Sequence, residues 1–352
     1  MAGAGCGPGE LRLCGLTFHP HLAPGVRRAM ARWEAAALER LRAERLGGRL
    51  RDLGAAPEQM VVCDAEALSQ HGLSHDTICA RLARLLGLVG EGGRSDAPLP
   101  EGPLGLAAEA RLRRCTESAR GGCGLAAGAA VRRNTVLGVV GGYVMPAVAA
   151  EGFGAAGYRH CGADVRAELA RAVEGTTADV STAWRLLAGS YCMPYPEGLQ
   201  AEAPVSGSVR LAGPFPSPAT LCMLGWGNAA ALINDPRAQP RAWVEGNDAA
   251  AAMVASEANC AVLPVAVRGV VLPVLVAVRD IAPGEQLLRE YGAGWSRELA
   301  GTWEVAEAGG LSAEALAGRL RLWGGGAMGS GQEAAADVQE AQLLSGASGA
   351  AP

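Results

Sequence analysis

Apolar residues near the start of the chain recur at helical spacing. Over residues 26–41 they lie three or four positions apart, which places them on one face of a helix. These residues are Val26, Met30, Trp33, Ala37 and Leu41. The pattern predicts an amphipathic helix that ends near Gly47-Gly48. Arginine and glutamate alternate over residues 39–45, so we interpret the opposite face as solvated rather than as a surface for nucleic acid.

Residues 64–88 predict two shorter helices, separated by a turn at Gly72-Leu73-Ser74. This outline is similar to a DNA-binding helix-turn-helix. However, Leu68 is bulky where close helix crossing needs a small residue, and His71 and Arg81 lie where apolar residues are expected. We therefore favour an ordinary helical hairpin.

The same region contains residues of the types that bind zinc. These are Cys63, His71, His75 and Cys79, the last three at the spacing of one helix face. Because Gly72 interrupts the helix between the two histidines, we expect no metal site here.

Beyond Gly121 the apolar residues occur in short runs that are typical of strands. Residues 125–146 predict short strands joined by turns, and residues 261–278 predict two strands joined at Arg268-Gly269. Pro264 and Pro273 within the latter pair indicate edge positions or bulges. A further short strand is expected over residues 286–292.

Residues 147–213 mix helices with loops. Asp164 is expected to cap a helix that ends at Gly175, and Asp179 to cap another that ends at Gly189.

Composition adds a few constraints. With 49% hydrophobic residues, the 352-residue chain can bury a sizeable core, which excludes a highly charged disordered protein. The net charge of -4 excludes a strongly basic protein that coats nucleic acid, although the first 51 residues carry nine arginines against four acids. Every basic residue is arginine, and the chain contains no lysine.

The cysteines and the apolar stretches bear on the compartment. The ten cysteines are scattered and form no C-x-x-C pair, which is typical of a reducing intracellular compartment. Residues 261–281 are the longest apolar stretch, but prolines and arginines interrupt it, so it is a poor membrane helix. No signal peptide is evident. We expect an intracellular protein, and the nucleus, the cytoplasm and an organelle all stay open.

Three separated segments contain the motifs that carry chemistry. They read GGCGLAAGAAVRRNTVLGVVGGYV (121–144), GWGNAAALINDP (225–236) and ANCAVLPVAVRGVVLPVLVAVRDIAPGEQLLREYG (258–292). In order, they supply a G-x-G, a GN…IN pair, and then R-D-I, G-E and E-Y-G. Over roughly residues 115–295, this ordered set resembles the SET domain of protein lysine methyltransferases.

The resemblance implies an α+β fold with a mainly β SET domain of the β-clip type, in which the GN…IN and EYG segments cross in a knot-like arrangement. It divides the chain into a helical N-terminal region with a linker (1–110), a SET-like domain (111–296), a C-terminal helical segment (297–323) and a tail expected to be disordered (324–352). Within the domain, we expect a helical insert at about 147–213 and an extra loop at 236–257.

The resemblance also implies the reaction and the residues that perform it. A methyl group passes directly from S-adenosyl-L-methionine to the neutral amine of a lysine on a substrate protein, histone or non-histone, without a metal. Tyr291 corresponds to the catalytic tyrosine, and Trp295 either covers the adenine or packs in the core. The residues expected to bind the cofactor are Gly122, Cys123, Gly124, Tyr143, Asn228, Asn234 and Asp235.

The chain departs from the family's pattern beside the expected cofactor. Asp235 replaces a histidine, Pro236-Arg237 replace Ser-Cys, and no cysteine after Cys260 supplies a zinc-binding tail. Two other interpretations therefore stay open. One is a non-catalytic SET-like interaction module, and the other is a chromatin or nucleic-acid adaptor that uses the basic N-terminal region.

Overall fold

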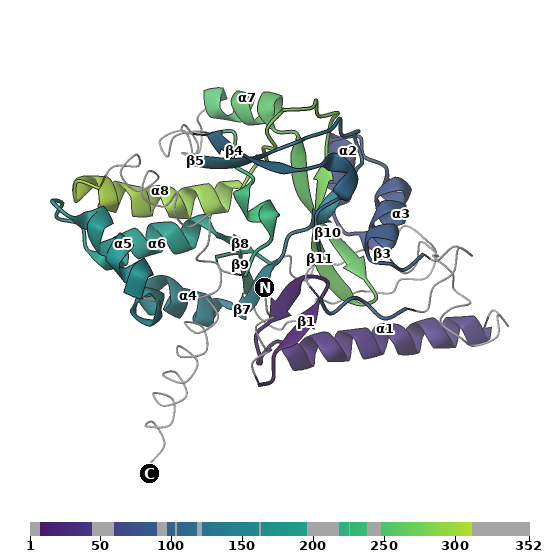
Figure 1. The fold of residues 1–352 in the computed structure, drawn as a ribbon. Coiled ribbons are helices and arrows are strands. Elements are labelled where there is room, and N and C mark those ends of the chain that lie inside the picture. The colour runs from purple at the N-terminus through teal and green to yellow at the C-terminus, as the bar shows by residue number, and fades with distance from the viewer. Residues whose placement is uncertain are drawn as a thin grey trace, which may run out of the picture.

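The structure is a computed structural model and describes residues 8–43, 60–89, 97–102, 104–117, 122–161, 163–195, 218–224, 226–237 and 248–311 (Figure 1). Its strands are β1 (Leu11–Leu13), β2 (Leu16–Phe18), β3 (Met60–Val62), β4 (Arg113–Glu117), β5 (Gly122–Ala126), β6 (Val136–Val139), β7 (Gly142–Pro146), β8 (Cys192–Pro194), β9 (Ala219–Cys222), β10 (Cys260–Val267) and β11 (Val270–Ala277). Its helices are α1 (Ala23–Ala43), α2 (Ala65–Gln70), α3 (His75–Leu85), η3 (Ala108–Ala110), α4 (Ala147–Ala156), η5 (Gly157–His160), α5 (Ala163–Val173), α6 (Val180–Ser190), η6 (Ala229–Leu232), α7 (Asp248–Glu257) and α8 (Ala293–Ala308).

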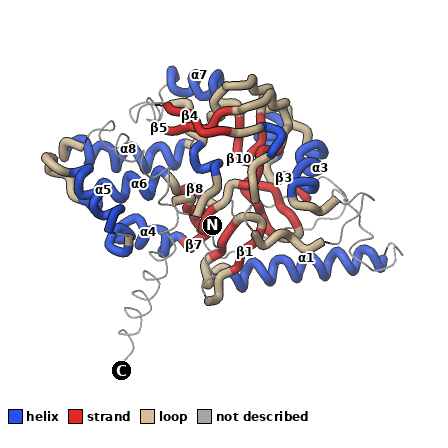
Figure 2. The backbone as a smooth tube through the Cα atoms, viewed as in Figure 1, coloured by secondary structure: helices blue, strands red, loops and turns tan. Residues whose placement is uncertain are grey.

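The described strands form three sheets, with strand orders β1-β2-β7-β9-β8, β3-β10-β11-β6 and β4-β5. Helices α4, α5, α6 and α8 gather at one end of the molecule, whereas α2 and α3 lie beside the four-stranded sheet at the other (Figures 1 and 2). This mixture of helices with several separate sheets agrees with the expected α+β class.

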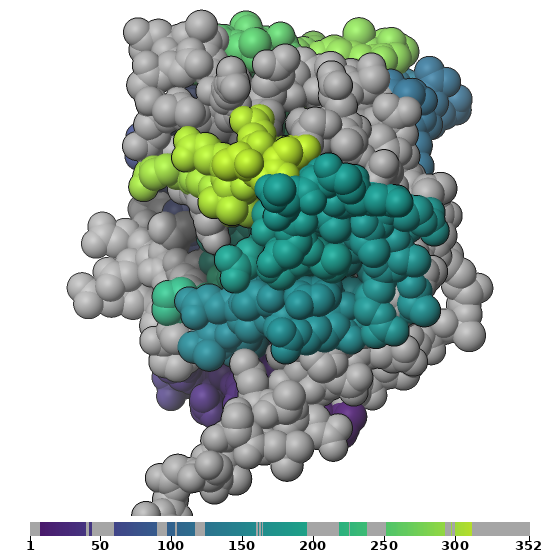
Figure 3. All heavy atoms as spheres, turned by 90° about the vertical axis from the view of Figure 1, so that its left-hand side faces the viewer, coloured from purple at the N-terminus to yellow at the C-terminus, as the bar shows by residue number. Residues whose placement is uncertain are grey.

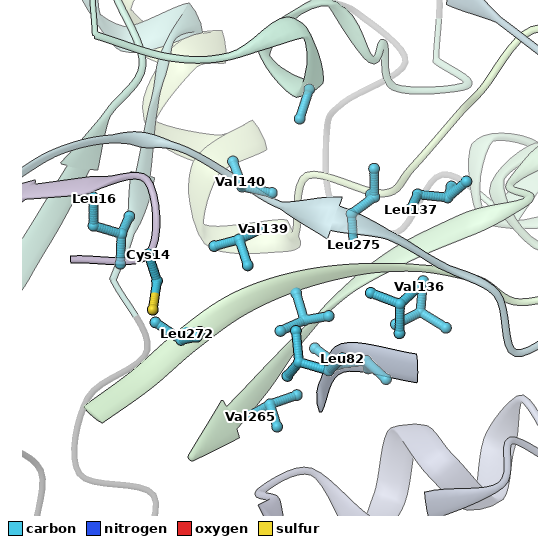
Figure 4. Close-up of a cluster of buried hydrophobic side chains, with 14 of the residues drawn as sticks. Cys14, Leu16, Leu82, Val136, Leu137, Val139, Val140, Val265, Leu272 and Leu275 are labelled. Carbon is cyan, nitrogen blue, oxygen red and sulfur yellow. The ribbon is translucent and has the colours of Figure 1, made fainter. Parts of the chain in front are cut away.

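The four-stranded sheet is built around the predicted hairpin. Strands β10 and β11 pair antiparallel over their whole length, and the turn between them places Arg268 at φ 46° and Gly269 at φ 85°. Two positive φ angles in a two-residue loop suit the twist of a hairpin. Side chains of β6, β11 and α3, among them Val139, Leu275 and Leu82, meet in the main hydrophobic core (Figure 4).

The two hairpin prolines do not lie on edge strands, and that expectation is wrong. Both β10 and β11 are interior strands, and Pro264 pairs directly with Pro273. Each proline lies just beyond the last residue that pairs with the outer neighbouring strand, β3 for Pro264 and β6 for Pro273. The N–H group that proline lacks therefore leaves no carbonyl of that strand without a hydrogen bond. Its carbonyl still accepts a hydrogen bond, from Cys63 N (2.8 Å) for Pro264 and from Val140 N (2.8 Å) for Pro273.

The five-stranded sheet separates two hydrophobic cores, because successive residues of a strand point to opposite faces. Val144 and Leu221 belong to the main core, whereas Tyr143 and Cys222, their chain neighbours, belong to a second core against the helices. Figure 3 shows α4–α6 and α8 side by side on this face of the molecule.

The first 110 residues contribute strands as well as the expected helices. Strand β2 pairs parallel with β7, and β3 pairs antiparallel with β10. Helix α1 lies against the β10–β11 turn, where the Arg268 guanidinium carbon is 5.9 Å from the centre of the Trp33 ring. The expected boundary at residue 110 stays a prediction, but sheet pairing runs across it.

The helices predicted over residues 64–88 and from Asp164 and Asp179 all form, although the cap predicted at Asp164 is wrong. Ser74 caps α3, with its hydroxyl accepting from Thr77 N (3.3 Å), after a turn in which Gly72 has φ 54°. This arrangement confirms the helical hairpin. Asp179 caps α6 by accepting from Thr182 N (2.7 Å). Helix α5 begins at Ala163, one residue before its predicted cap.

Several expectations fall on residues outside the described part of the chain. These are the helix end at 47–48, much of the insert after residue 195, residues 238–247 of the extra loop expected at 236–257, and the C-terminal segment and tail after residue 311. The second half of that expected loop is described, and it forms α7. Among the described residues, no helix is both long and apolar enough to cross a membrane.

Candidate active site

The C-terminal EYG segment meets the GN…IN segment through backbone hydrogen bonds. Asn234 forms a parallel bridge with Leu288. Four N–H groups of this segment donate to different parts of the chain: Leu287 N to Leu125 O (2.7 Å), Leu288 N to Asn259 Oδ1 (2.9 Å), Arg289 N to Asn234 O (2.9 Å) and Tyr291 N to Asp235 Oδ2 (2.9 Å). Because these partners differ, the regular strand expected over 286–292 does not form, and isolated bridges take its place.

Asn259 fixes the approach to this crossing. It is fully buried, and its amide donates to Gln286 O (2.7 Å) and Glu285 Oε1 (3.0 Å) while its oxygen accepts from Leu288 N. A buried side-chain amide with three bonds to one segment holds that segment in a single register.

Replacing Asn259 by Ala is therefore expected to lower the free energy of unfolding by about 1–3 kcal/mol, because two backbone groups lose their partners inside the protein. Urea unfolding followed by circular dichroism measures the change. Ser256→Ala, on the exposed end of α7, serves as the control and should leave the midpoint nearly unchanged. An equally stable Asn259→Ala protein would contradict this role.

Tyr291 lies at the crossing, half-buried, with its side chain held at both ends. Its hydroxyl donates to Ile233 O (2.5 Å), and its ring lies under a guanidinium whose carbon, on Arg289, is 4.4 Å from the ring centre. Burial raises the pKa of the Tyr291 phenol far above its ordinary value, and Arg289 opposes that shift. The hydroxyl therefore stays protonated at neutral pH, with its oxygen able to accept a further hydrogen bond.

Asp235 positions Tyr291 from the other side. Its Oδ1 accepts from the backbone N (2.9 Å) and Nε (2.7 Å) of Arg237, and its Oδ2 accepts from Arg237 Nη2 (2.6 Å) and from Tyr291 N. Four bonds occupy the acceptor positions of one carboxylate. Both side chains of this ion pair are at most 8% exposed. The cofactor contact of Asp235 stays a prediction, and donors of the protein itself already engage its carboxylate.

Arg289 was not singled out from the sequence. It is 5% exposed, and within the described part of the chain no hydrogen bond or ion pair engages its guanidinium. Residues two apart on an extended segment share a face. The spacing of Arg289 and Tyr291 therefore indicates from the sequence that their side chains lie together. A permanent positive charge thus lies against the ring of the candidate catalytic tyrosine.

The G-x-G glycines lie in β5, beside the same segment. Ala126 forms a bridge with Gln286, and a Cβ added to Gly124 would lie 2.2 Å from Gln286 Nε2. That amide nitrogen is buried and has no hydrogen-bond partner. The absence of a side chain at Gly124 therefore lets the Gln286 amide, an unused donor, pack directly against the backbone of β5.

Asn228 and Tyr143 have structural partners of their own. Asn228 caps η6 by accepting from Ala230 N (3.1 Å), and its amide donates to Val139 O (2.7 Å). Tyr143 is buried in β7 with its ring centre 5.0 Å from that of Trp226. Trp226 Nε1 is a second buried donor without a partner.

The structure brings most of the predicted residues together. Helix η6, which Asn228 caps, packs against β5 and leads directly into Asn234 and Asp235. Tyr143 instead packs with Trp226 in the second hydrophobic core. The side chains of Cys123 and Trp295 lie outside the described atoms. Tyr191 was not predicted, yet it raises the pKa of Tyr291 electrostatically, so its phenol lies nearby.

The cysteine–histidine group of the N-terminal hairpin gathers only in part. His75 Nε2 lies 3.8 Å from Cys79 Sγ, but no set of three potential ligands comes together among the described residues. Burial raises the pKa of the Cys79 thiol to about 12, which disfavours the thiolate that zinc binds.

Comparisons with known proteins give partial structural likenesses only. No protein-family model matches the chain, and no curated protein matches it. Solved structures that resemble it include the ATXR5 SET domain with dimethylated histone H3 (20% identity, TM-score 0.28) and the Neurospora SET domain protein DIM-5, a histone lysine methyltransferase (14% identity, TM-score 0.29). Each likeness covers 51% of this chain, which spans 56% and 52% of those chains.

Proposed function

We propose that this protein is a SET-type protein-lysine N-methyltransferase that uses S-adenosyl-L-methionine. The proposal rests chiefly on one observation: the hydroxyl of Tyr291, from the EYG motif, bonds to Ile233 O, from the GN…IN motif. These two segments lie more than 50 residues apart in the sequence. Their contact through Tyr291 supports the role of catalytic tyrosine that the resemblance to the SET family implies for this residue.

The residues present fit the cofactor. S-adenosyl-L-methionine carries a carboxylate and an adenine, both of which accept hydrogen bonds. Gln286 Nε2 and Trp226 Nε1 are buried donors without partners, and such donors are costly unless a ligand engages them. The first of them packs against the backbone of Gly124, in the G-x-G motif. When bound, the cofactor supplies an electrophilic methyl group on a sulfonium sulfur.

The acceptor must be a neutral amine, although free lysine has a pKa of about 10.4. Two features of this site favour the neutral form. Burial disfavours any charge, and the adjacent Arg289 guanidinium disfavours a second positive charge. The Tyr291 oxygen can accept a hydrogen bond from the amine and so orient the nitrogen lone pair towards the methyl group. The new N–C bond forms as the S–C bond breaks, and the methylated nitrogen then loses a proton to solvent.

Incubation with methyl-labelled cofactor and a mixture of lysine-bearing proteins, histones included, tests the proposal. We expect label in methyl-lysine after acid hydrolysis, and its loss on Tyr291→Phe. Label found only in other residues would exclude a lysine methyltransferase.

Arg289 offers a second prediction. Arg289→Gln removes the positive charge, so the pH profile of kcat should move up by about one unit or more, because the bound amine then binds its proton more tightly. Arg289→Lys keeps the charge and should keep most of the original profile. An unchanged profile in Arg289→Gln would exclude an electrostatic role.

A third prediction follows from composition. The untagged chain contains no lysine, so incubation with the cofactor alone should give no methyl-lysine in the enzyme itself. Mass spectrometry of the protein digest checks this. Methyl-lysine in the preparation must come from a second protein, whose identity would name a substrate.

A further inference from the structure

Two cysteines face each other across the end of the five-stranded sheet. In the β8–β9 register, Cys192 pairs with Cys222. The flanking pairs exchange backbone hydrogen bonds, since Met223 N donates to Tyr191 O (2.8 Å) and Tyr195 N donates to Ala219 O (2.9 Å). Because bonded and non-bonded pairs alternate along an antiparallel ladder, Cys192 and Cys222 form a non-hydrogen-bonded pair.

This type of pair brings side chains closest together. Its Cα atoms are about 4.5 Å apart, within the range of about 4.4–6.8 Å that a disulfide spans. Both cysteines pack in the second hydrophobic core, so both thiols point to the same face of the sheet. Neither cysteine is in a disulfide in the structure.

We propose that Cys192 and Cys222 form a reversible redox pair, which closes to a disulfide when a low-molecular-weight disulfide such as oxidised glutathione is present. This inference goes beyond the proposed methyl transfer and does not depend on it. Cys192 is half-buried, whereas Cys222 is fully buried. We therefore expect Cys192 to react first with the small disulfide.

The exchange balances in two steps. The Cys192 thiolate attacks one sulfur of oxidised glutathione, which forms a mixed disulfide and releases one glutathione thiolate. The Cys222 thiolate then attacks the Cys192 sulfur and displaces the second glutathione. The two thiol protons of the protein pass to the two glutathiones, and reduced glutathione reverses the sequence.

The location places this pair beside the candidate site. Tyr191 precedes Cys192 and acts electrostatically on Tyr291. On the other side of β9, Cys222 pairs with Tyr143. The crosslink would tie β8 to β9 next to two aromatic residues of the site.

Trypsin makes the test direct, because it releases the two cysteines in separate peptides, Leu186–Arg210 and Leu211–Arg237, each with one cysteine. The full-length folded protein is treated with oxidised glutathione, alkylated and digested. We expect the two peptides linked in a 1:1 species that dithiothreitol separates, together with a higher Tm, since a crosslink restricts the unfolded chain.

Two variants complete the experiment. Cys192→Ser, at the half-buried position, should abolish the linked species and the rise in Tm, whereas Cys115→Ser, a half-buried cysteine of β4, should change neither. Peptides that remain free, or that carry only glutathione, in the folded wild-type protein would overturn the proposal. If Cys192→Ser does not fold, Cys222→Ala supplies the same comparison.

Discussion

Replacing Tyr291 by Phe is expected to lower kcat for methyl transfer about 10²-fold or more, because a misplacement of the acceptor nitrogen by about 1 Å is enough for such a loss. The change removes one oxygen. The phenyl ring still fills its place beneath Arg289, so the cation–π contact at 4.4 Å persists and the fold should remain intact.

The matched control is Tyr158→Phe, which removes a hydroxyl from the helical end of the molecule, in η5. It should transfer methyl groups at the wild-type rate. Circular dichroism and thermal unfolding verify that both variants are folded. If Tyr291→Phe retains full activity while folded, the hydroxyl has no catalytic role, although the fold assignment survives.

The largest effect on stability is expected at Asp235. Asp235→Ala leaves the buried Arg237 charge without its two-fold partner and also frees Tyr291 N. Breaking a buried ion pair on one side costs about 3–5 kcal/mol in the free energy of unfolding. Guanidinium unfolding followed by fluorescence measures this loss, with activity falling in parallel because Tyr291 loses its anchor.

A double-mutant cycle separates the ion pair from the individual side chains. Asp235→Ala with Arg237→Ala should cost less than the sum of the two single changes, because no unpaired charge remains buried. The pair of Arg171, which is exposed, and Glu168, which is half-buried, in α5 provides the comparison: Glu168→Ala should cost less than about 1 kcal/mol, because the charge left behind on Arg171 stays in water. Additive losses at Asp235 and Arg237 would show that the two charges do not interact.

The sequence predicts the elements whose signals are local. The turns at Gly72-Leu73-Ser74 and Arg268-Gly269, and the cap at Asp179, depend only on neighbouring residues, and the corresponding helices and hairpin form as expected. By contrast, β1, β2 and β3 have three residues each. Such short runs show no clear alternation, and distant partners decide whether they become strands.

The residues of the candidate site fall into the same two groups. Motifs within single segments predict Tyr291 and the glycines of β5. The roles of Arg237, Asn259 and Gln286 depend on segments that meet only in the folded chain, so no spacing along the sequence indicates them. Pro264 and Pro273 also could not be placed from the sequence. They fit in interior strands only because the pairing with β3 and β6 ends next to them.

The central claim is that residues 122–124, 226–237 and 286–291 together hold S-adenosyl-L-methionine. Calorimetric titration of the folded full-length protein with this cofactor tests it most directly. We predict saturable binding at one site, competed by S-adenosylhomocysteine and weakened in Gly124→Val, where the added side chain would meet Gln286. A folded protein that binds neither compound would contradict the account and would favour a non-catalytic interaction module.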